Sequence, residues 1–413
     1  MEYWFFSEQQ YHPAWDKYDG PICITQPTSL IDPKTAADLF DRYFAEFRLA
    51  DQLGLNIAVN EHHASLACMS SSPLLTLAAV ARETKNAKLL SLGTQMVNRT
   101  DPIRIAEEIA MVDQLSRGRL EAGLIKGTAV EAFASGEKPV RMTERFWETV
   151  DLVVKALSTT SGAFRWDSEN YHYRSVNIVP RCFQQTHPPM WVVGASPSTA
   201  REIARRGHKM AVFGLGTALV RSCFDAYRAE YLAIHNKPAP LDRFAHNALT
   251  VVGNSEKEAN LRGDKLYEFY RAIQRKPPPL SNPPGYASVS DNVKSLMSGR
   301  ANITDKFAKG PSYSELLTTG KLVVGTPDKV AERIAEIFVE DGGIGHFLLQ
   351  GGGTLTFEET SDHLRIFATE VAPRVKRLLA EKVGLKLPER TQVPTASIAS
   401  QATTDLATSV YLE

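Results

Sequence analysis

The chain has 413 residues, of which 43% are hydrophobic and 23% charged, enough material for one large core or two smaller ones. Its 47 basic side chains balance 47 acidic ones, which argues against a nucleic-acid partner or a basic membrane-binding face. The four cysteines show neither zinc-site spacing nor the density of a disulfide framework, and therefore fit a reducing compartment. The N-terminus lacks signal-peptide features and no run approaches the length of a membrane span, so we expect a cytoplasmic protein without membrane contact.

Short β-rich runs alternate with longer amphipathic segments along the chain. The helical pattern is clearest at residues 35–54 and 102–118, where apolar side chains recur on one stripe. Eight runs have the composition of strands buried on both faces: 2–7, 55–60, 89–97, 119–125, 190–195, 209–214, 248–253 and 346–351. Eight such alternations predict a (β/α)8 TIM barrel. A doubly wound open sheet stays the alternative, although the chain lacks a dinucleotide-binding fingerprint.

Two insertions and a tail interrupt this rhythm. Residues 8–34 follow the first strand, and residues 274–320 lie between the seventh and eighth strands. The second insertion is rich in proline and glycine, which favours a lid over a cavity. We therefore expect a single barrel domain over residues 1–385 and a loosely held C-terminal extension over residues 386–413.

Candidate site residues follow the predicted strands, because barrel enzymes carry their chemistry at the C-terminal ends of strands. Glu61, His62 and His63 end the second strand, and the alternation of side chains predicts that the two histidines point in opposite directions. Their spacing does not favour a shared metal ion. A plain alternative is that the three side chains only satisfy backbone groups at the strand end.

A second group of candidates follows the fourth and fifth strands. Lys126 offers a positive charge, while Gly194, Ser196 and Thr199 precede or begin a helix whose free N–H groups favour an anion such as phosphate. Ordinary helix capping by Ser196 or Ser198 is the alternative.

Five stretches together resemble the bacterial luciferase-like flavin monooxygenases. They are "NEHH", "LSLGTQMV", "DPIRIAEEIAMVDQLSRGRLEAGLIKG", "PPMWVVGASPSTAREIARRG" and "VVGTPDKVAERIAEIF". The resemblance covers about residues 1–378, apart from most of the two insertions. It implies a barrel that holds FMN in its reduced form, FMNH2, at the C-terminal face, and a homodimer.

The resemblance also assigns roles to single residues. His62 matches the catalytic histidine, with Glu61 and His63 as supporting neighbours. Gln95 and Met96 match a non-prolyl cis peptide beneath the isoalloxazine ring, and Ile125 falls near the reactive edge of that ring. Lys126, Ser196 and Thr199 match phosphate ligands, while Gly194 and Ala195 supply backbone groups. Lysine replaces the usual arginine, and Ile125 and Ala195 depart from luciferase itself, which weakens any expectation of light emission.

The resulting hypothesis is a two-component monooxygenase. A separate NAD(P)H:flavin reductase would supply FMNH2, dioxygen would form a C4a-hydroperoxide, and a histidine with a pKa near neutrality would move the proton. Tyr11, Trp15, Tyr18 and Tyr286 in the insertions suggest a small apolar or aromatic substrate. The alternatives are an F420-dependent hydride-transfer enzyme, a flavin-binding protein without activity, and a metal-dependent hydrolase.

Overall fold

Eight parallel strands form a closed ring in the computed structural model: β1 (Glu2–Ser7), β2 (Asn56–Val59), β3 (Leu89–Gln95), β4 (Leu120–Ile125), β7 (Met190–Val193), β8 (Lys209–Val212), β9 (Phe244–Val252) and β11 (His346–Gln350). The structure describes residues 1–276 except Val97 and Pro139, the single residues Val289, Val293 and Met297, and residues 310–384. Pairing of β11 with β1 and of β8 with β9 closes the ring. The fold is therefore the predicted (β/α)8 barrel, and closure excludes the open doubly wound sheet.

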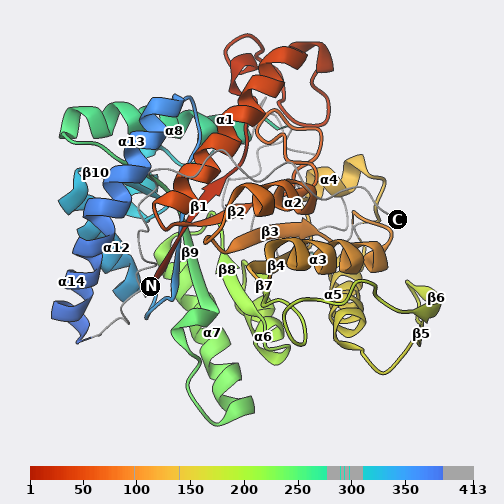
Figure 1. The fold of residues 1–413 in the computed structure, drawn as a ribbon. Coiled ribbons are helices and arrows are strands. Elements are labelled where there is room, and N and C mark those ends of the chain that lie inside the picture. Colours follow the sequence, from red (N-terminus) through yellow and green to blue (C-terminus); the bar gives the residue numbers. More distant parts are fainter. Residues whose placement is uncertain are drawn as a thin grey trace, which may run out of the picture.

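Three further strands were not predicted. The short β10 (Leu322–Gly325) pairs in parallel with the second half of β9, outside the closed ring. The antiparallel hairpin of β5 (Phe164–Asp167) and β6 (His172–Val176) lies at the periphery of the molecule (Figure 1). Most hairpin side chains are exposed or half-buried, so these runs lack the continuous apolar composition of the barrel strands.

Helices surround the ring (Figure 1). The two expected segments are helical, as α1 and α3, and both begin with an aspartate followed by proline. Asp32 accepts a hydrogen bond from the N–H of Thr35, and Asp101 accepts from the N–H groups of Ile103 and Arg104, so each carboxylate satisfies donors in the first turn. The α-helices are α1 (Pro33–Gln52), α2 (Pro73–Glu83), α3 (Pro102–Ser116), α4 (Ala129–Ala134), α5 (Met142–Ser158), α6 (Pro197–Arg205), α7 (Thr217–His235), α8 (Glu256–Ile273), α11 (Tyr313–Thr318), α12 (Pro327–Glu340), α13 (Phe357–Ile366) and α14 (Ala372–Val383).

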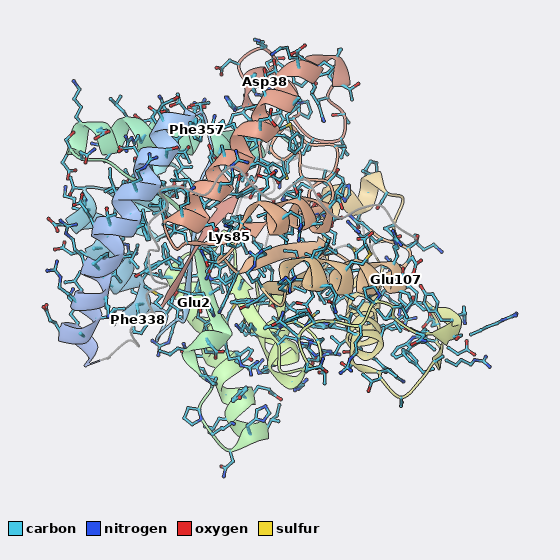
Figure 2. The ribbon with its side chains drawn as sticks, viewed as in Figure 1. Glu2, Asp38, Lys85, Glu107, Phe338 and Phe357 are labelled. Atoms are coloured by element: carbon cyan, nitrogen blue, oxygen red, sulfur yellow. The ribbon has the colours of Figure 1, made fainter. Side chains whose placement is uncertain are left out.

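The apolar core has two layers separated by the strands. The larger layer packs helices against the outside of the ring. The smaller layer fills the ring, with Trp4, Phe6, Ala58, Leu90, Leu92, Trp191, Ala211, Ala245 and Leu348. Charged side chains such as Asp38 and Glu107 lie on the outer helices (Figure 2). Because neighbouring residues of a strand face opposite layers, both faces of each strand are buried.

Polar side chains cross the N-terminal end of the ring. Glu121 on β4 lies 3.1 Å from Nζ of Lys209 on β8, and Trp191 donates its indole N–H to the same carboxylate. Glu2, at the start of β1 (Figure 2), pairs with Lys88 at 2.7 Å. The pair of Glu121 and Lys209 is buried, whereas the pair of Glu2 and Lys88 is half-buried. The cavity described below lies at the opposite, C-terminal end.

The first insertion is ordered, and most of the second lies outside the described residues. Residues 8–34 contain the 3-10 turns His12–Ala14 and Thr28–Leu30 before α1 begins. Of the predicted lid, only residues 274–276, three isolated positions and residues 310–320, including α11, are described. The expected extension, residues 386–413, also lies outside the described part. Among the described residues, no helix combines the length and apolar character needed to cross a bilayer.

Candidate active site

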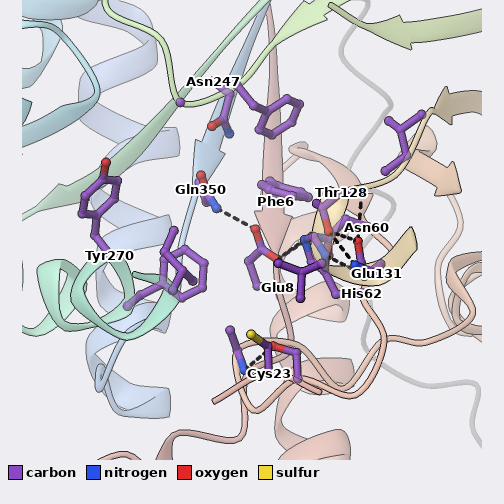
Figure 3. A pocket seen from close by; sticks show the side chains of 18 of the residues that line it. Phe6, Glu8, Cys23, Asn60, His62, Thr128, Glu131, Asn247, Tyr270 and Gln350 are labelled. Carbon is purple, nitrogen blue, oxygen red and sulfur yellow. Dashed lines mark hydrogen bonds and ion pairs between the residues drawn. The ribbon is translucent and has the colours of Figure 1, made fainter. Parts of the chain in front are cut away.

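A cavity of about 380 Å³ lies at the C-terminal ends of the strands (Figure 3). Half of the ring contributes apolar side chains, which we call the apolar arc: Leu92 from β3, Ile125 from β4, Val193 from β7 and Phe213 just after β8. The other half contributes Phe6 and Leu249 together with four polar side chains, which we call the polar arc: Asn60 after β2, Glu8 after β1, Gln350 on β11 and Asn247 on β9. The cavity is therefore chemically two-sided.

His62 forms an ion pair at the edge of this cavity. Its Nδ1 lies 2.9 Å from Oε1 of Glu131, and its Nε2 lies 3.9 Å from Oε2 of Glu8. Burial disfavours charge on the imidazole, but the two carboxylates outweigh burial and raise the pKa of His62 to about 9. Burial likewise opposes ionisation of Glu131, yet the charge and hydrogen bond of His62 lower its pKa to about 2. The raised pKa favours the protonated ring, in place of the pKa near neutrality expected from the sequence.

Glu8 is a buried carboxyl group on the polar arc. It is 6% exposed, and burial raises its pKa, against the opposing charge of His62. The side-chain amides of Asn60 and Gln350 both donate to it, the latter at 2.7 Å (Figure 3). Two amides and an imidazolium therefore fix the orientation of this carboxyl group.

Glu61 and His63 support the wall behind the cavity. Glu61 is fully buried, and its carboxylate accepts from Arg99 at 3.2 Å and from the N–H of Gln95 at 3.2 Å. Nε2 of His63 lies 2.8 Å from the same carboxylate. Because β2 ends at Val59, residues 61–63 are not extended strand, and both histidines line the cavity. The two rings contact different carboxylates, Glu131 for His62 and Glu61 for His63.

Gln95 and Met96 are fully buried and do not line the cavity. The non-prolyl cis peptide bonds among the described residues are Leu92–Gly93 and Gln185–Thr186, so the expected cis bond at Gln95–Met96 is wrong. At the first of these, β3 shifts register against β4. A Cβ on Gly93 would lie 3.0 Å from the carbonyl oxygen of Gly123, so glycine permits the close approach of the two strands there.

The candidate phosphate ligands lie at the ends of two neighbouring strands. Because β4 pairs with β7, Ile125 at the end of β4 and Lys126 just after it lie beside Gly194, which follows β7. Lys126 is half-buried, with Nζ 3.4 Å from Oγ1 of Thr143, and burial lowers its pKa against the opposing effect of Glu144.

The helix that follows β7 is capped in the ordinary way. Oγ of Ser196 accepts a hydrogen bond from the N–H of Thr199 at 3.2 Å. The same Oγ lies 3.0 Å from Oγ1 of Thr199. Ala195 is exposed, whereas Gly194 is buried so closely that a Cβ would crowd Met210. Capping by Ser196 therefore exists. Pro197 has no N–H and the N–H of Ala200 donates to the carbonyl of Ser196, so among residues 197–200 the N–H of Ser198 is the one left for an anion.

Sequence reasoning missed the two acidic partners of His62. Glu131 was detectable only as half of a capping box with Thr128, a pattern that predicts the start of α4 and not a contact with a histidine 69 positions away. Glu8 was detectable as the first charged residue after β1, at the end where barrels carry their chemistry.

The aromatic residues expected on the cavity wall pack elsewhere. Tyr11 and Trp15 are buried within the first insertion, where Tyr11 accepts from the N–H of Asp32 and Trp15 donates to the carbonyl of Leu66. Ile22 and Cys23 line the cavity instead. Tyr286 lies outside the described residues. Within the described ranges, no group of three or more histidine, cysteine or acidic side chains is arranged to hold a metal ion.

Three curated proteins illustrate what this chain is similar to. The oxygenase component of the flavin-dependent trigonelline monooxygenase of Acinetobacter baylyi is 25% identical over 350 residues, covering 83% of this chain and 91% of that protein. Limonene 1,2-monooxygenase of Rhodococcus erythropolis is 25% identical over 78% of each chain. The uncharacterized protein y4wF of Sinorhizobium fredii is 33% identical over 171 residues, and the match spans 41% of this chain and only 49% of that protein.

Solved structures share the fold at lower identity. The monooxygenase RslO1 of Streptomyces bottropensis superposes with a TM-score of 0.69 at 22% identity, covering 90% of this chain and 99% of that one. An F420-dependent secondary alcohol dehydrogenase superposes with a TM-score of 0.60 at 15% identity, covering 91% of this chain and 98% of that one. The family model described as luciferase-like monooxygenase matches residues 24–344, most of the chain. The chain belongs to the luciferase-like monooxygenase family.

Proposed function

We propose that this protein is the oxygenase of a two-component system that uses FMNH2 and dioxygen to oxygenate a small organic substrate. The observation that carries the proposal is the His62–Glu131 pair, which holds a protonated imidazole at the edge of a cavity that is apolar on one side. Membership of the family and the similarity to an oxygenase component of a flavin-dependent enzyme support it. A separate NAD(P)H:flavin reductase, a cytoplasmic location and a homodimer belong to the same proposal.

The residues present fit a flavin. The apolar arc offers a wall for an isoalloxazine ring, with Leu92 and Ile125 on adjacent strands. Beyond it, Lys126 offers a positive charge to a phosphate, and the start of α6 offers the N–H of Ser198 and the hydroxyl groups of Ser196 and Thr199. Glu61, Gln95 and Met96 would act through the wall behind the cavity. Bound FMNH2 would supply the two electrons that dioxygen needs for reaction with the substrate.

The protein's own contribution is to hold and release a proton. Nδ1–H of His62 donates to Glu131, which fixes the ring, so Nε2–H is the proton that can be transferred. Glu8 faces the same nitrogen and stabilises the imidazolium. Because the resting ring is charged, His62 acts first as an acid and then recovers its proton from water. Apolar side chains such as Phe213 and Val193 exclude bulk water from the cavity.

The decisive experiment measures oxygen uptake by the full chain with NADH, an added flavin reductase and FMN, across a panel of small organic compounds. We expect that, with one class of compound, hydrogen peroxide release falls and a product forms. That product should carry label from 18O2. Binding of reduced F420 in preference to FMNH2 would favour hydride transfer instead. Flavin binding without any product across the panel would favour a protein that only binds flavin.

A further inference from the structure

The polar arc contains an amide donor that the protein leaves without a partner. Nδ2 of Asn247 has no hydrogen-bond partner among the described residues, although Asn247 is only 6% exposed and its side chain lines the cavity (Figure 3). A buried N–H without an acceptor destabilises a protein, and binding an acceptor relieves that cost. The side chain lines the cavity, and rotation about its broad χ2 torsion would bring this donor to an oxygen or nitrogen acceptor of a ligand.

Glu8 supplies the complementary group on the same arc. Its two oxygens accept from Asn60 and Gln350, and a carboxylate has further lone pairs for a third donor. Strand order places the two groups on one side of the cavity, because β11 carries Gln350 between Asn247 on β9 and Glu8 after β1. A ligand on this side therefore meets a donor and an acceptor.

The polar groups that follow β4 on the opposite side, Thr128 and Glu131, already bond each other and His62. Leu92, Ile125, Val193 and Phe213 offer only apolar surface, which suits one face of a flat ring. The two halves of the barrel thus separate two recognition tasks, with the flavin ring on the apolar arc and the substrate on the polar arc.

We propose that the substrate carries a carbonyl-type acceptor beside an N–H donor, as in a carboxamide or lactam, and that Asn247 and Glu8 recognise these two groups. This inference rests on the proposed function and deepens it. It narrows the sequence-based expectation of an apolar or aromatic substrate, because a molecule without polar groups would leave Asn247 without an acceptor.

Three probes of similar size separate the hydrogen bond donated by Asn247 from the one accepted by Glu8. Benzamide has an acceptor and a donor, acetophenone has only the acceptor, and cumene has neither. Dissociation constants are measured by calorimetry or ligand-observed NMR on the full chain, with and without FMN. We expect wild type to bind benzamide at least about tenfold more tightly than cumene, since two hydrogen bonds separate them. Asn247→Leu should weaken benzamide and acetophenone about three- to tenfold without weakening cumene. Glu8→Gln should weaken benzamide alone.

Two further variants keep the test independent of misfolding. Asn247→Asp preserves side-chain volume and exchanges the donor for an acceptor, so it should reproduce the loss of benzamide affinity. Leu249→Val, on the same strand and also lining the cavity, is the matched control and should affect the three probes alike. Equal affinity of wild type for cumene and benzamide, or an unchanged benzamide preference in both Asn247 variants, would overturn the inference. Loss of flavin binding would instead refute the proposed function, since probe binding needs neither flavin nor turnover.

Discussion

Glu131 joins the start of α4 to the imidazole of His62. One carboxylate oxygen lies 2.9 Å from Nδ1 of His62, while the other accepts from the N–H and hydroxyl of Thr128 and completes the capping box. A single side chain therefore fixes both a helix end and the orientation of the candidate catalytic ring.

Replacing Glu131 with glutamine should lower the pKa of His62 from about 9. Glutamine at this position keeps the capping geometry but removes the charge that favours imidazolium, so burial then dominates. NMR titration of the His62 ring measures the change. Glu107→Gln, on the outer face of α3 (Figure 2), is the control and should leave the His62 titration unchanged. A His62 pKa still near 9 in the Glu131 variant would show that the ion pair is not the cause.

The ion pair should also make stability depend on pH in two windows. The folded pKa of His62 lies above its ordinary value of 6.5, so its contribution is full below pH 6.5 and is lost as pH rises through about 9. The folded pKa of Glu131 lies below 4.5, so its contribution is present above pH 4.5 and is lost as pH falls through about 2. Urea titrations at pH 6, 8 and 10 should show the stability difference between wild type and His62→Asn shrinking at pH 10. A difference independent of pH would contradict the assigned ion pair.

Replacing His62 with asparagine should remove the proton donor and keep the flavin wall. We expect product formation to fall about 10²- to 10⁴-fold, the usual contribution of a positioned acid or base, while hydrogen peroxide release rises. FMN affinity, measured by fluorescence titration, should stay close to wild type. His235→Asn, at the exposed end of α7, is the control. Unchanged turnover in the His62 variant would remove the residue from the mechanism.

Replacing Lys126 with alanine should weaken FMN binding by about 1–3 kcal/mol, the range for losing a charge-assisted hydrogen bond. Lys126→Arg should retain most of the affinity because it keeps the charge. Anaerobic equilibrium titration measures the change, with Lys85→Ala, an exposed lysine (Figure 2), as the control. If Lys126→Ala binds FMN as tightly as wild type, the phosphate lies elsewhere.

Replacing Ser196 with alanine separates helix capping from ligand binding. Loss of the cap on α6 should lower the free energy of unfolding by about 1 kcal/mol. Ser312→Ala removes the corresponding cap on α11, whose residues do not line the cavity, and should lower stability similarly. Only the Ser196 variant should also weaken FMN binding in titration. Equal FMN affinity in the two variants would leave Ser196 as a cap alone.

The sequence by itself determined the eight barrel strands, two of the helices and the end of the barrel that carries the candidate site. Burial on both faces selects continuous apolar runs, so all eight barrel strands were recognisable. The apolar stripes located α1 and α3, although the start of α1 was expected at residue 35 and not at Pro33. The same local pattern did not separate the β5–β6 hairpin from a loop, because most of its side chains are exposed or half-buried. It also missed β10, which is buried but only four residues long. The sequence did identify His62 as a candidate site residue, because it comes just after β2.

Only the tertiary structure decided which side chains meet. Closure of the ring brings Glu8 against Gln350, 342 positions apart, and the placement of α4 brings Glu131 to His62. It also raised the pKa of His62 through its two carboxylate neighbours, and within the described part of the chain it left Nδ2 of Asn247 without a partner. The physical reason is that periodicity reflects the neighbours of a residue along the chain, whereas pKa and hydrogen bonding depend on neighbours in space, which chain closure and helix packing select.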